Sequence, residues 1–529
     1  MKQLFGVYDK KTNNYSDNSA DVIQYESSDL RLWIMGRVET KSGINATEEI
    51  TEILNNHFSE FTEYVAGVYI VVACNLKNKK VAVFHDRTTS HAVMYYTETE
   101  DKIYIGTSLK KILCESKIKR ELNGNAIEDF ITNGFLYGQE TLIKNVYKIK
   151  AFHSLVLSDG KAEQVKADYP VASMTKGEAL DKFKETLDRS VRKCFDGEAE
   201  INLPLSSGFD SNYIAYIADN EKNVPVNAFS VGGKFGKNEL PIVKNNVECY
   251  NNINLHSALT DDNTLQNLPD IVWRLEGSVY EVGLFLQYEL ARLVEKNQKK
   301  YLICGECADQ VFNMNYLKKD RFEPDKKDNE VIYYEFSEYP FIFGSYLILK
   351  KNGILANSFG IETRYPYLDY ELVSIGNSLA EINRKDKRVH VANCRECLPA
   401  EIIANMSKIG GSTDCHSLFN SSEEIQSFFK KVESSDLFKK YGEVFKRHSF
   451  TESEKQTGTD RTKTAVRNAV LDILHIGKDG RKKSAYFNEE MKIREYMNIA
   501  YLIVFEELFI KGNYDMSEIG IKSKLDEIL

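Results

Sequence analysis

The chain has 529 residues, of which 42% are hydrophobic and 28% are charged, a balance typical of globular proteins with roughly two to four domains at this length. Its 69 basic residues are outnumbered by 78 acidic ones, and the net charge of -9 argues against bulk binding to nucleic acid or to an anionic membrane. Because the start MKQLFGVYDKKTNNY lacks a signal-peptide segment and no apolar run approaches the about 20 residues that span a bilayer, we expect a soluble cytoplasmic protein.

The first third of the chain is predicted to consist mostly of β-strands. Four runs rich in Val, Ile and Tyr are separated by short polar turns, the pattern of an antiparallel meander; they cover residues 64–74, 79–86, 93–97 and 102–108. A helical stretch follows near Ala126–Asn133, and strand character returns in VYKIK and HSLVLSDGKAEQV. We therefore expect a β-rich domain in this part of the chain.

A different pattern begins at about residue 175. The segment KGEALDKFKETLDRSVRKCF has apolar residues at helical spacing, and short apolar runs then alternate with helical stretches. The runs INLPL, VNAFSV and YLICG are predicted strands of a parallel sheet, because alternating strands and helices form βαβ units. The sequence therefore predicts an α/β second domain, with domains at 1–170 and 171–529.

The predicted strand INLPL leads into LSSGFDS, a turn of small residues followed by a helix. Ligands of open α/β sheets lie beyond the carboxyl ends of the strands, and a helix N-terminus offers free N–H groups to an anion. Ser206, Ser207, Gly208 and Ser211 suit such an anion site, and Asp210 suits it if a divalent cation bridges the carboxylate to a phosphate. The later segment GGKFGK lacks the spacing of a Walker A loop. An ordinary helix N-cap explains LSSGFDS equally well on its own.

A second acidic turn favours a ligand site over a simple cap. The segment YLICGECADQVF again ends a predicted strand and supplies Gly305, Glu306 and Asp309 as a helix begins. Two strand-end turns that each supply a carboxylate could hold one Mg²⁺ between Asp210 and Asp309.

Two further turns contain charged residues. FGIETRYPYLDYEL combines Glu362, Arg364 and Asp369 around Pro366, and we favour a structural ion-pair turn there over an acidic site. MSKIGGS places Lys408 before two glycines, although a lone lysine in a loop usually faces solvent.

The nine cysteines are an odd number spread over a long chain and do not predict a disulfide framework. The CxxC pairs Cys304/Cys307 and Cys394/Cys397 lie too far apart for a zinc ribbon, so we interpret them as reduced cysteines without a metal. Residues 450–485 are highly charged and are predicted to form a solvated loop or surface helix.

Taken in order, these segments resemble the motifs of the asparagine synthetase family. LSSGFDSN is similar to its pyrophosphate loop LSGGLDSS, CGECADQVF to SGEGADELF, and GIETRYPYLD to GIExRxPFLD. NCRECLPAEIIANMSKIGG resembles the segment ending LPxxIxxRxKxGF, which places the family's catalytic lysine at Lys408. LFGVY resembles the family's start CGIxG, and the segment from FTEYV to LKKIL resembles its stretch from LxGxFAFAxxD to FASExKAL. The resemblance runs from residue 1 to about 420, and residues 421–529 match no part of it.

The resemblance implies a fold and a reaction. The N-terminal domain would be an antiparallel β-sandwich of the Ntn-hydrolase type, as in class II glutamine amidotransferases, and the C-terminal domain a PP-loop ATP pyrophosphatase with a doubly wound parallel sheet. With ATP and Mg²⁺, such a domain activates a carboxylate as an acyl-adenylate, releases pyrophosphate, and lets an amine attack to give an amide and AMP.

The resemblance also implies the residues of the site. The implied ATP and pyrophosphate contacts are Leu205, Ser206, Ser207, Gly208, Asp210, Ser211, Ser230 (beside the adenine) and Gly305. Asp210 and Asp309 would bind the metal, Lys408 would stabilise developing negative charge, and Glu306 would contact the amine or transfer its proton.

The chain departs from the family at the glutaminase nucleophile. The family uses an N-terminal cysteine whose α-amine takes part in catalysis. Here residue 2 is Lys2, Phe5 precedes Gly6, and no cysteine occurs before Cys74, which lies in a predicted core strand. We therefore predict that the N-terminal domain is inactive and that the nitrogen comes from ammonia or a substrate amine rather than from glutamine.

Smaller departures leave alternatives open. Ser207 replaces a loop glycine and Gln310 replaces an acid, so a catalytically degenerate binding or regulatory protein is one alternative. Cysteine-less relatives include lasso-peptide cyclases and β-lactam synthetases, which form an amide within one molecule, although β-lactam synthetases have tyrosine where this chain has Glu306. A PP-loop enzyme acting on RNA is disfavoured by the acidic charge and the β-rich domain. The sequence does not select the carboxylate, small molecule or peptide, and it leaves a homodimer open.

Overall fold

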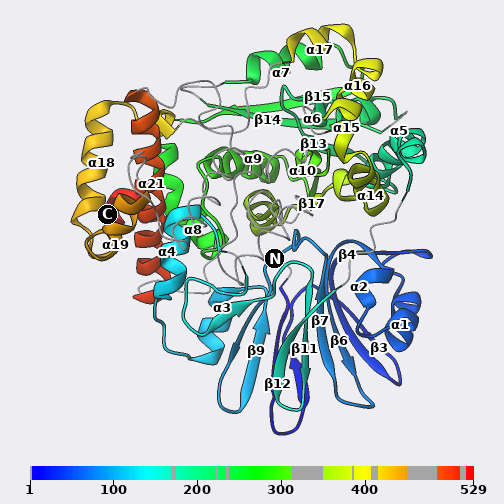
Figure 1. Cartoon of the computed structure of the whole chain (residues 1–529), viewed down its shortest axis with the longest axis vertical. Helices are drawn as coiled ribbons and strands as arrows, with labels where there is room; N and C mark the ends of the chain where they lie inside the picture. The colour runs from blue at the N-terminus through cyan, green and yellow to red at the C-terminus, as the bar shows by residue number, and fades with distance from the viewer. Residues whose placement is uncertain are drawn as a thin grey trace.

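The structure is a computed structural model, shown in Figure 1. It describes residues 3–136, 138–167, 174–221, 224–233, 238–261, 263–312, 349–383, 387–406, 415–448, 485–512 and 520–529.

Two antiparallel sheets form the N-terminal part of the chain (Figure 1). The first has the strand order β10-β8-β9-β1-β2 and the second β12-β11-β7-β6-β4-β3, with β5 paired to β4. The strands of the first sheet are β1 (Phe5–Asp9), β2 (Asn14–Asp17), β8 (Tyr95–Glu98), β9 (Lys102–Gly106) and β10 (Val146–Lys148). Those of the second are β3 (Ile23–Glu26), β4 (Leu30–Thr40), β5 (Gly43–Ile44), β6 (Ala66–Asn75), β7 (Val81–His85), β11 (His153–Ser158) and β12 (Lys161–Lys166).

The two sheets pack face to face, because the side chains between them form one buried cluster. Tyr8 and Ile103 enter this cluster from the first sheet, and Ile70 and Leu155 enter it from the second. The alternate residues of the second sheet face outward against α1 (Thr47–Asn56) and α2 (Phe61–Tyr64), in a separate buried cluster. The strand β6 is therefore buried on both faces, which explains the continuous apolar run in its sequence. The predicted β-sandwich is confirmed.

The predicted single meander is wrong in one respect. All four predicted strands form, as β6, β7, β8 and β9, and β6–β7 and β8–β9 pair antiparallel. However, β7 and β8 belong to different sheets. The intervening segment is buried and held by Asp86, whose carboxylate accepts hydrogen bonds from Thr88 and Ser90. The chain thus crosses from one sheet to the other instead of turning back as a hairpin.

Parallel strands form the second part of the chain. β13 (Ile201–Pro204), β14 (Val226–Gly232) and β15 (Ile253–Leu259) pair in parallel, as do β16 (Tyr301–Ile303) and β17 (Glu362–Arg364). Since β13 also packs beside β16, the carboxyl ends of both groups lie at one edge. The predicted α/β fold with a parallel sheet is confirmed. The predicted boundary at residue 170 falls in 168–173, outside the described residues, and stays a prediction.

Helices accompany these strands on both sides (Figure 1). They are α5 (Lys176–Lys193), α6 (Phe209–Asp219), α7 (Leu240–Val247), α8 (Leu268–Leu275), α9 (Leu284–Lys296), α10 (Ala308–Phe312), α13 (Leu355–Ser358), α14 (Tyr370–Ser378), α15 (Ala380–Asn383), α16 (Arg388–Cys397) and α17 (Ala400–Asn405). Short 3₁₀ turns are η1 (Thr264–Asn267), η5 (Pro366–Leu368) and η6 (Cys415–Leu418), and η4 (Lys350–Ile354) is a π-helical turn. The α5 helix begins at a capping box formed by Thr175 and Glu178.

The last part of the chain is helical and packs against both preceding parts. It contains α18 (Ser422–Ser434), α19 (Asp436–His448), α21 (Ala485–Phe505), the π-turn η8 (Glu506–Ile510) and α22 (Leu525–Ile528). The helix α21 lies beside α18 and α19 on the left of Figure 1 and packs against α8 and against α4 (Gly124–Asn133) of the N-terminal part. None of the described helices is both long and apolar enough to cross a membrane. The charged segment 450–485 lies almost wholly outside the described residues.

Candidate functional site

The loop after β13 is fixed by its own polar side chains. The N–H of Ser206 donates to Ser211 Oγ at 3.1 Å, and Asn212 Nδ2 donates to the carbonyl oxygens of Ser206 and Gly208 at 2.9 and 2.8 Å. Gly208 is the N-cap of α6, and the first-turn N–H groups of a helix have no acceptor within the helix. The segment LSSGFDS is therefore a rigid turn that presents the start of α6 beyond the carboxyl end of β13, as predicted.

Ser207 is hydrogen-bonded to a residue outside the loop. It is buried, and its N–H and hydroxyl both donate to Glu239 Oε2, at 2.9 and 3.0 Å. Glu239 directly precedes α7. The sequence pattern predicted that the N–H group of Ser207 would bind an anionic ligand. In this structure it donates its hydrogen bond to the carboxylate of Glu239 instead.

The second strand-end turn lies directly against the first. A Cβ atom added to Gly305 would lie 3.3 Å from the backbone nitrogen of Ser211 and 3.4 Å from Asp210 Cβ. A side chain at residue 305 would crowd the loop after β13, so glycine allows the two turns to approach. Asp309 lies in the first turn of α10, which starts at this point.

Asp210 and Asp309 meet at one cationic atom, the side-chain nitrogen of Lys387. Lys387 Nζ lies 2.7 and 2.6 Å from the two carboxylate oxygens of Asp210 and 2.8 Å from Asp309 Oδ1. Its side chain is 7% exposed. The predicted pairing of the two carboxylates is thus present in space, but sequence reasoning missed the lysine, which stands in the charged run NRKDKR and carries no motif of its own.

His390 supports Asp210 from the buried side. Its Nε2 lies 3.1 Å from Asp210 Oδ1, and the side chain is fully buried among Phe183, Tyr213 and Tyr367. An Nε2–H tautomer fits these contacts, because a carboxylate can only accept. The sequence offered no signal for His390, because its position depends on how α16 packs against α6.

Charge and burial act against each other in this cluster. Burial disfavours ionisation of Asp210, but Lys387 and the hydrogen bond from His390 outweigh it and lower the pKa of the carboxyl group. Burial likewise disfavours the charged form of Lys387, but Asp210 and Asp309 raise the pKa of the ammonium group above its usual value. Burial lowers the pKa of His390 despite its contact with Asp210. The pair is therefore a carboxylate and an ammonium at neutral pH, with a neutral imidazole beside them.

The donor set fits a divalent cation that is shared with a phosphate. Two carboxylates lie around one position that the ammonium group of Lys387 occupies, and Mg²⁺ is usually bound by one or two carboxylates together with phosphate oxygens and water. In the part of the chain that the structure describes, these residues do not belong to a group of three or more His, Cys, Asp or Glu side chains placed to hold a metal. An ion here would take its other ligands from phosphate and water, and Lys387 Nζ would have to move.

Glu306 lies in the turn between β16 and α10. Asn352 Nδ2, on the π-turn η4, donates to Glu306 Oε1. Burial raises the pKa of Glu306, and the hydrogen bond from Asn352 and the charge of Lys351 only partly offset it. The neighbouring thiols of Cys304 and Cys307 are buried as well, and burial raises the pKa of each. Glu306 is thus a carboxyl group with increased proton affinity, as suits a group that accepts a proton.

Of the remaining predicted site residues, the structure describes Leu205 and Ser230 but not Lys408. The N–H of Leu205 donates to the carbonyl of Phe229 at 2.8 Å, so Ser230 lies beside the loop at the adjacent strand end. Lys408 falls in 407–414, outside the described residues, and its assignment stays a prediction.

The turn around Pro366 is structural. Arg364 donates to Glu362 Oε1 at 2.8 Å and to Glu198 Oε1 at 2.7 Å, and Asp369 caps the start of α14. The favoured interpretation of FGIETRYPYLDYEL as an ion-pair turn is confirmed.

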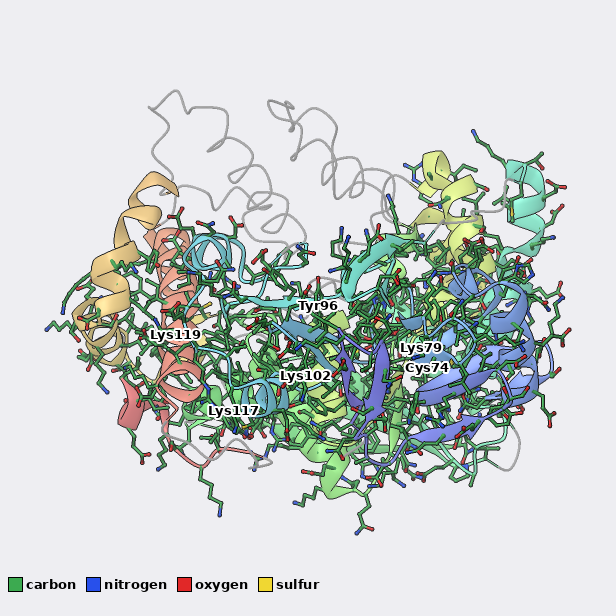
Figure 2. The ribbon with its side chains drawn as sticks, turned by 90° about the horizontal axis from the view of Figure 1, so that it is seen from below. Cys74, Lys79, Tyr96, Lys102, Lys117 and Lys119 are labelled. Carbon is green, nitrogen blue, oxygen red and sulfur yellow. The ribbon has the colours of Figure 1, made fainter. Side chains whose placement is uncertain are left out.

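The start of β1 holds an apolar side chain where the family motif has cysteine. Phe5 is buried beneath α3 (Leu109–Ser116), and its backbone N–H donates to Ser19 Oγ at 3.0 Å. The nearest cysteine in sequence, Cys74, lies in β6 within the strand layers (Figure 2), and burial raises the pKa of its thiol to about 12. A buried thiol of this kind is a poor nucleophile.

Two family models match the chain in the order that the motifs predict. The model described as glutamine amidotransferase domain matches residues 25–169, and the model described as asparagine synthase matches residues 182–331. The second match contains both acidic turns of the site. The two matches together support a member of the asparagine synthetase family.

Curated relatives of this asparagine synthetase family member are distant. The chain is 22% identical over 317 residues to "Asparagine synthetase [glutamine-hydrolyzing] 1" of Bacillus subtilis, a match that covers 56% of this chain and 49% of the relative. It is 22% identical over 287 residues to "Putative asparagine synthetase [glutamine-hydrolyzing] 2" of Methanocaldococcus jannaschii, covering 52% of this chain and 54% of the relative. The chain thus spans about half the length of these relatives. Among solved structures, glutamine phosphoribosylpyrophosphate amidotransferase of B. subtilis with ADP and GMP matches at 6% identity and a TM-score of 0.18, over 71% of this chain and 86% of that one.

Proposed function

We propose that this family member forms an amide bond at the expense of ATP, through an acyl-adenylate that releases pyrophosphate and then AMP. One observation carries the proposal: Asp210 and Asp309, which come from different strand ends, converge on one cationic position beside a rigid loop at the start of α6. This arrangement suits the triphosphate of a nucleotide and its counter-ion.

Each group of site residues has a proposed role that follows from its position. The start of α6 and the loop Leu205–Gly208 would receive the pyrophosphate, with Gly305 allowing close approach and Ser230 lying towards the adenine. Asp210 and Asp309 would hold Mg²⁺, which when bound neutralises phosphate charge. Lys387, displaced from the carboxylates, would remain within reach of the phosphates as a second positive charge. Lys408 is proposed to stabilise charge in the transition state.

The second half-reaction transfers a proton. The amine nitrogen attacks the acyl carbon, a C–N bond forms, the bond to the AMP oxygen breaks, and the nitrogen loses a proton. Glu306 would accept that proton, because its raised pKa brings the carboxylate closer to the operating pH.

We propose ammonia or a substrate amine as the nitrogen donor, rather than glutamine. Phe5 fills the position of the family's nucleophile with a buried ring, and the thiol of Cys74 is buried in a strand. A glutaminase needs an accessible nucleophile beside a free α-amine, and neither residue supplies one.

Product analysis tests this function. The protein would be incubated with ATP, Mg²⁺ and a panel of carboxylates including aspartate, with ammonium or with glutamine, and ATP–pyrophosphate exchange, AMP and amide would be followed. We expect exchange with at least one carboxylate, and amide from ammonium or an amine but not from glutamine. Asp210→Asn should lower exchange by at least about 100-fold, because it removes a charge from the cation position. Asp29→Asn, which alters an exposed ion pair with Lys77, is the matched control. Exchange that survives Asp210→Asn would contradict the proposal.

Two alternative functions are an intramolecular cyclase and a protein that binds or regulates without catalysis. An intramolecular cyclase of a peptide or specialised metabolite would use the same adenylation and would show exchange only with its own substrate. A degenerate binding or regulatory protein is favoured by a specific observation, since Glu239 takes the N–H of Ser207 and Lys387 takes the cation position. Calorimetry that finds no Mg²⁺-dependent ATP binding would support the degenerate protein.

A further inference from the structure

Two cysteines lie one turn apart at the end of α16 and take no part in the site described above. Both Cys394 and Cys397 are free thiols, and Cys394 is fully buried, whereas Cys397 is partly exposed. The other CxxC pair, Cys304 and Cys307, is buried at both positions. Oxidants and thiol reagents reach a sulfur atom from solvent, so of the two pairs the one on α16 is open to modification.

A lysine from another helix contacts the accessible thiol. Lys184 Nζ, on α5, lies 2.9 Å from Cys397 Sγ, and the lysine side chain is half-exposed. Burial works against the charge of Lys184, but the contact with Cys397 and the charge of Asp188 raise the pKa of the ammonium group. An ammonium beside a thiol favours the thiolate, which is the form that attacks oxidants. Because a helix C-terminus disfavours negative charge, the reactivity of Cys397 depends on Lys184.

The second thiol of the pair lies within reach of the first. Residues three apart in an α-helix have Cα atoms about 5 Å apart, from a rise of about 1.5 Å per residue and a radius of about 2.3 Å. This separation lies inside the range of about 4.4–6.8 Å that disulfides require. Cys397 is the last residue of α16 and Leu398 is extended, so the final turn can adjust without disturbing the rest of the helix. Burial raises the pKa of the Cys394 thiol, so Cys397 reacts first.

Cys394 connects this pair to the candidate site. Its sulfur lies 3.7 Å from His390 Nε2, the same nitrogen that lies 3.1 Å from Asp210 Oδ1. His390 lies one turn before Cys394 on α16, and Lys387 directly precedes this helix. A new bond at the Cys394 sulfur therefore changes the surroundings of the histidine that supports Asp210.

We propose that Cys397 is a peroxide-reactive thiol and that Cys394 converts its oxidised form into a disulfide within α16. The Cys397 thiolate attacks one oxygen of hydrogen peroxide, the O–O bond breaks, and the leaving hydroxide takes a proton from Lys184 and becomes water. The Cys394 thiol then attacks the sulfenic sulfur, an S–S bond forms, the S–O bond breaks, and a second water leaves with the thiol proton. Lys184 regains the proton that the Cys397 thiol released on ionisation. Two thiols are thus oxidised to one disulfide, and one peroxide is reduced to two waters.

Mass spectrometry of the full-length protein after peroxide treatment tests the proposal. Remaining thiols would be blocked with N-ethylmaleimide, dimedone would trap sulfenic acid, and peptides that cover the nine cysteines would be followed over time. We expect a disulfide between Cys394 and Cys397, and dimedone labelling of Cys397 in Cys394→Ala. Lys184→Met should slow oxidation of Cys397 by about tenfold. Lys182→Met is the matched control, because Lys182 lies on the same helix but pairs with Glu371, so this variant should keep the rate.

Other cysteines of the chain serve as internal controls. Cys114 is more exposed than Cys397, and Cys304 and Cys307 have the CxxC spacing without an exposed sulfur. Oxidation of Cys114 as fast as that of Cys397, or an unchanged rate in Lys184→Met with the fold intact by circular dichroism, would overturn the proposal. Sulfenic acid that persists at Cys397 beside an intact Cys394 would overturn the role of the second thiol. The measurement uses neither ATP nor a carboxylate, so its outcome is independent of the proposed function.

Discussion

Lys387 illustrates how single charges organise the centre of this molecule. Two carboxylates that approach one another would repel, and each would gain affinity for a proton. The ammonium group between them removes this repulsion and lowers the pKa of Asp210 against the effect of burial. Replacing only one member of such a buried set is costly, because the remaining charge is left unpaired. The two strand-end turns are therefore linked by electrostatics as well as by the close approach at Gly305.

A partly buried histidine, His153, gives a pH prediction at the same scale. Burial lowers the pKa of His153 to about 4, although its bond to the carbonyl of Ala151 opposes the shift. An unfolded histidine titrates near about 6.5. Between about pH 6.5 and pH 4 the unfolded chain binds this proton and the folded one does not, so the stability contribution is complete above about 6.5 and is lost as the pH falls.

The effect should be visible in denaturant unfolding. Stability lost between pH 7.5 and pH 4.5 should be about 1–3 kcal/mol smaller in His153→Gln than in the unsubstituted protein. His57→Gln, at a half-exposed histidine in an ion pair with Glu60, serves as the control. An equal loss in the His153 and His57 variants would contradict the assignment.

At the scale of elements, Glu276 joins the two main parts of the molecule. It ends α8, and its carboxylate accepts the N–H of Leu109 at 2.7 Å and the hydroxyl of Ser108 at 3.0 Å, at the start of α3. Lys110 Nζ adds an ion pair at 3.0 Å. A carboxylate is stabilising at a helix N-terminus, where N–H groups lack acceptors and the dipole is positive. One side chain from the α/β part thus caps a helix of the β-sandwich part.

Glu276→Gln should weaken this junction. The loss of charge-assisted hydrogen bonds and of the ion pair with partly buried Lys110 should cost about 2 kcal/mol of unfolding free energy. Glu98→Gln, which alters an exposed ion pair with Lys10, should cost less than about 1 kcal/mol. Hydrogen exchange should locate the effect in α3, and unchanged protection of α3 would contradict the assignment.

At the scale of the whole molecule, the C-terminal helices bridge both preceding parts. The helix α21 packs against α8 and against α4 (Figure 1), and Asn498 Nδ2 donates to the carbonyl of Ile131 at 2.7 Å. Its residues Met497, Tyr501 and Leu502 are buried in the same large cluster as the strands of the parallel sheet. Residues that match no part of the family motifs thus help to fix the relative position of the two preceding parts of the chain.

Leu502→Ala should therefore loosen two distant elements together. Removing a fully buried leucine side chain costs about 2–5 kcal/mol, and we expect faster hydrogen exchange in both α4 and α8. Leu54→Ala, in α1, is the matched control: Leu54 is equally buried but belongs to the separate cluster beneath the second sheet, so exchange should increase in α1 and not in α4. Increased exchange confined to α21 would contradict the bridging role.

The sequence predicted the two turns of the site, but it did not predict which remote side chains contact them. Local patterns located the two strand-end turns, and the loop is held by residues that are five or six apart in sequence, such as Ser206, Ser211 and Asn212. The contacts of Glu239, Lys387 and Asn352 join segments separated by 32, 177 and 46 residues. A lysine in a charged run or an asparagine in a helix has no pattern that predicts such contacts.

The sequence by itself determined the two kinds of sheet, the order of the motifs and the presence of carboxylates at two strand ends. It could do so because strand and helix periodicity, turn residues and motif spacing are local properties of the chain. Only the tertiary structure decided that β7 and β8 belong to different sheets, that Lys387 lies between Asp210 and Asp309, and that Glu306 faces Asn352. These outcomes depend on burial and on the packing of segments that are remote in sequence. Both change the charge state and the contacts of a side chain, and neither can be recognised from the residues next to it in sequence.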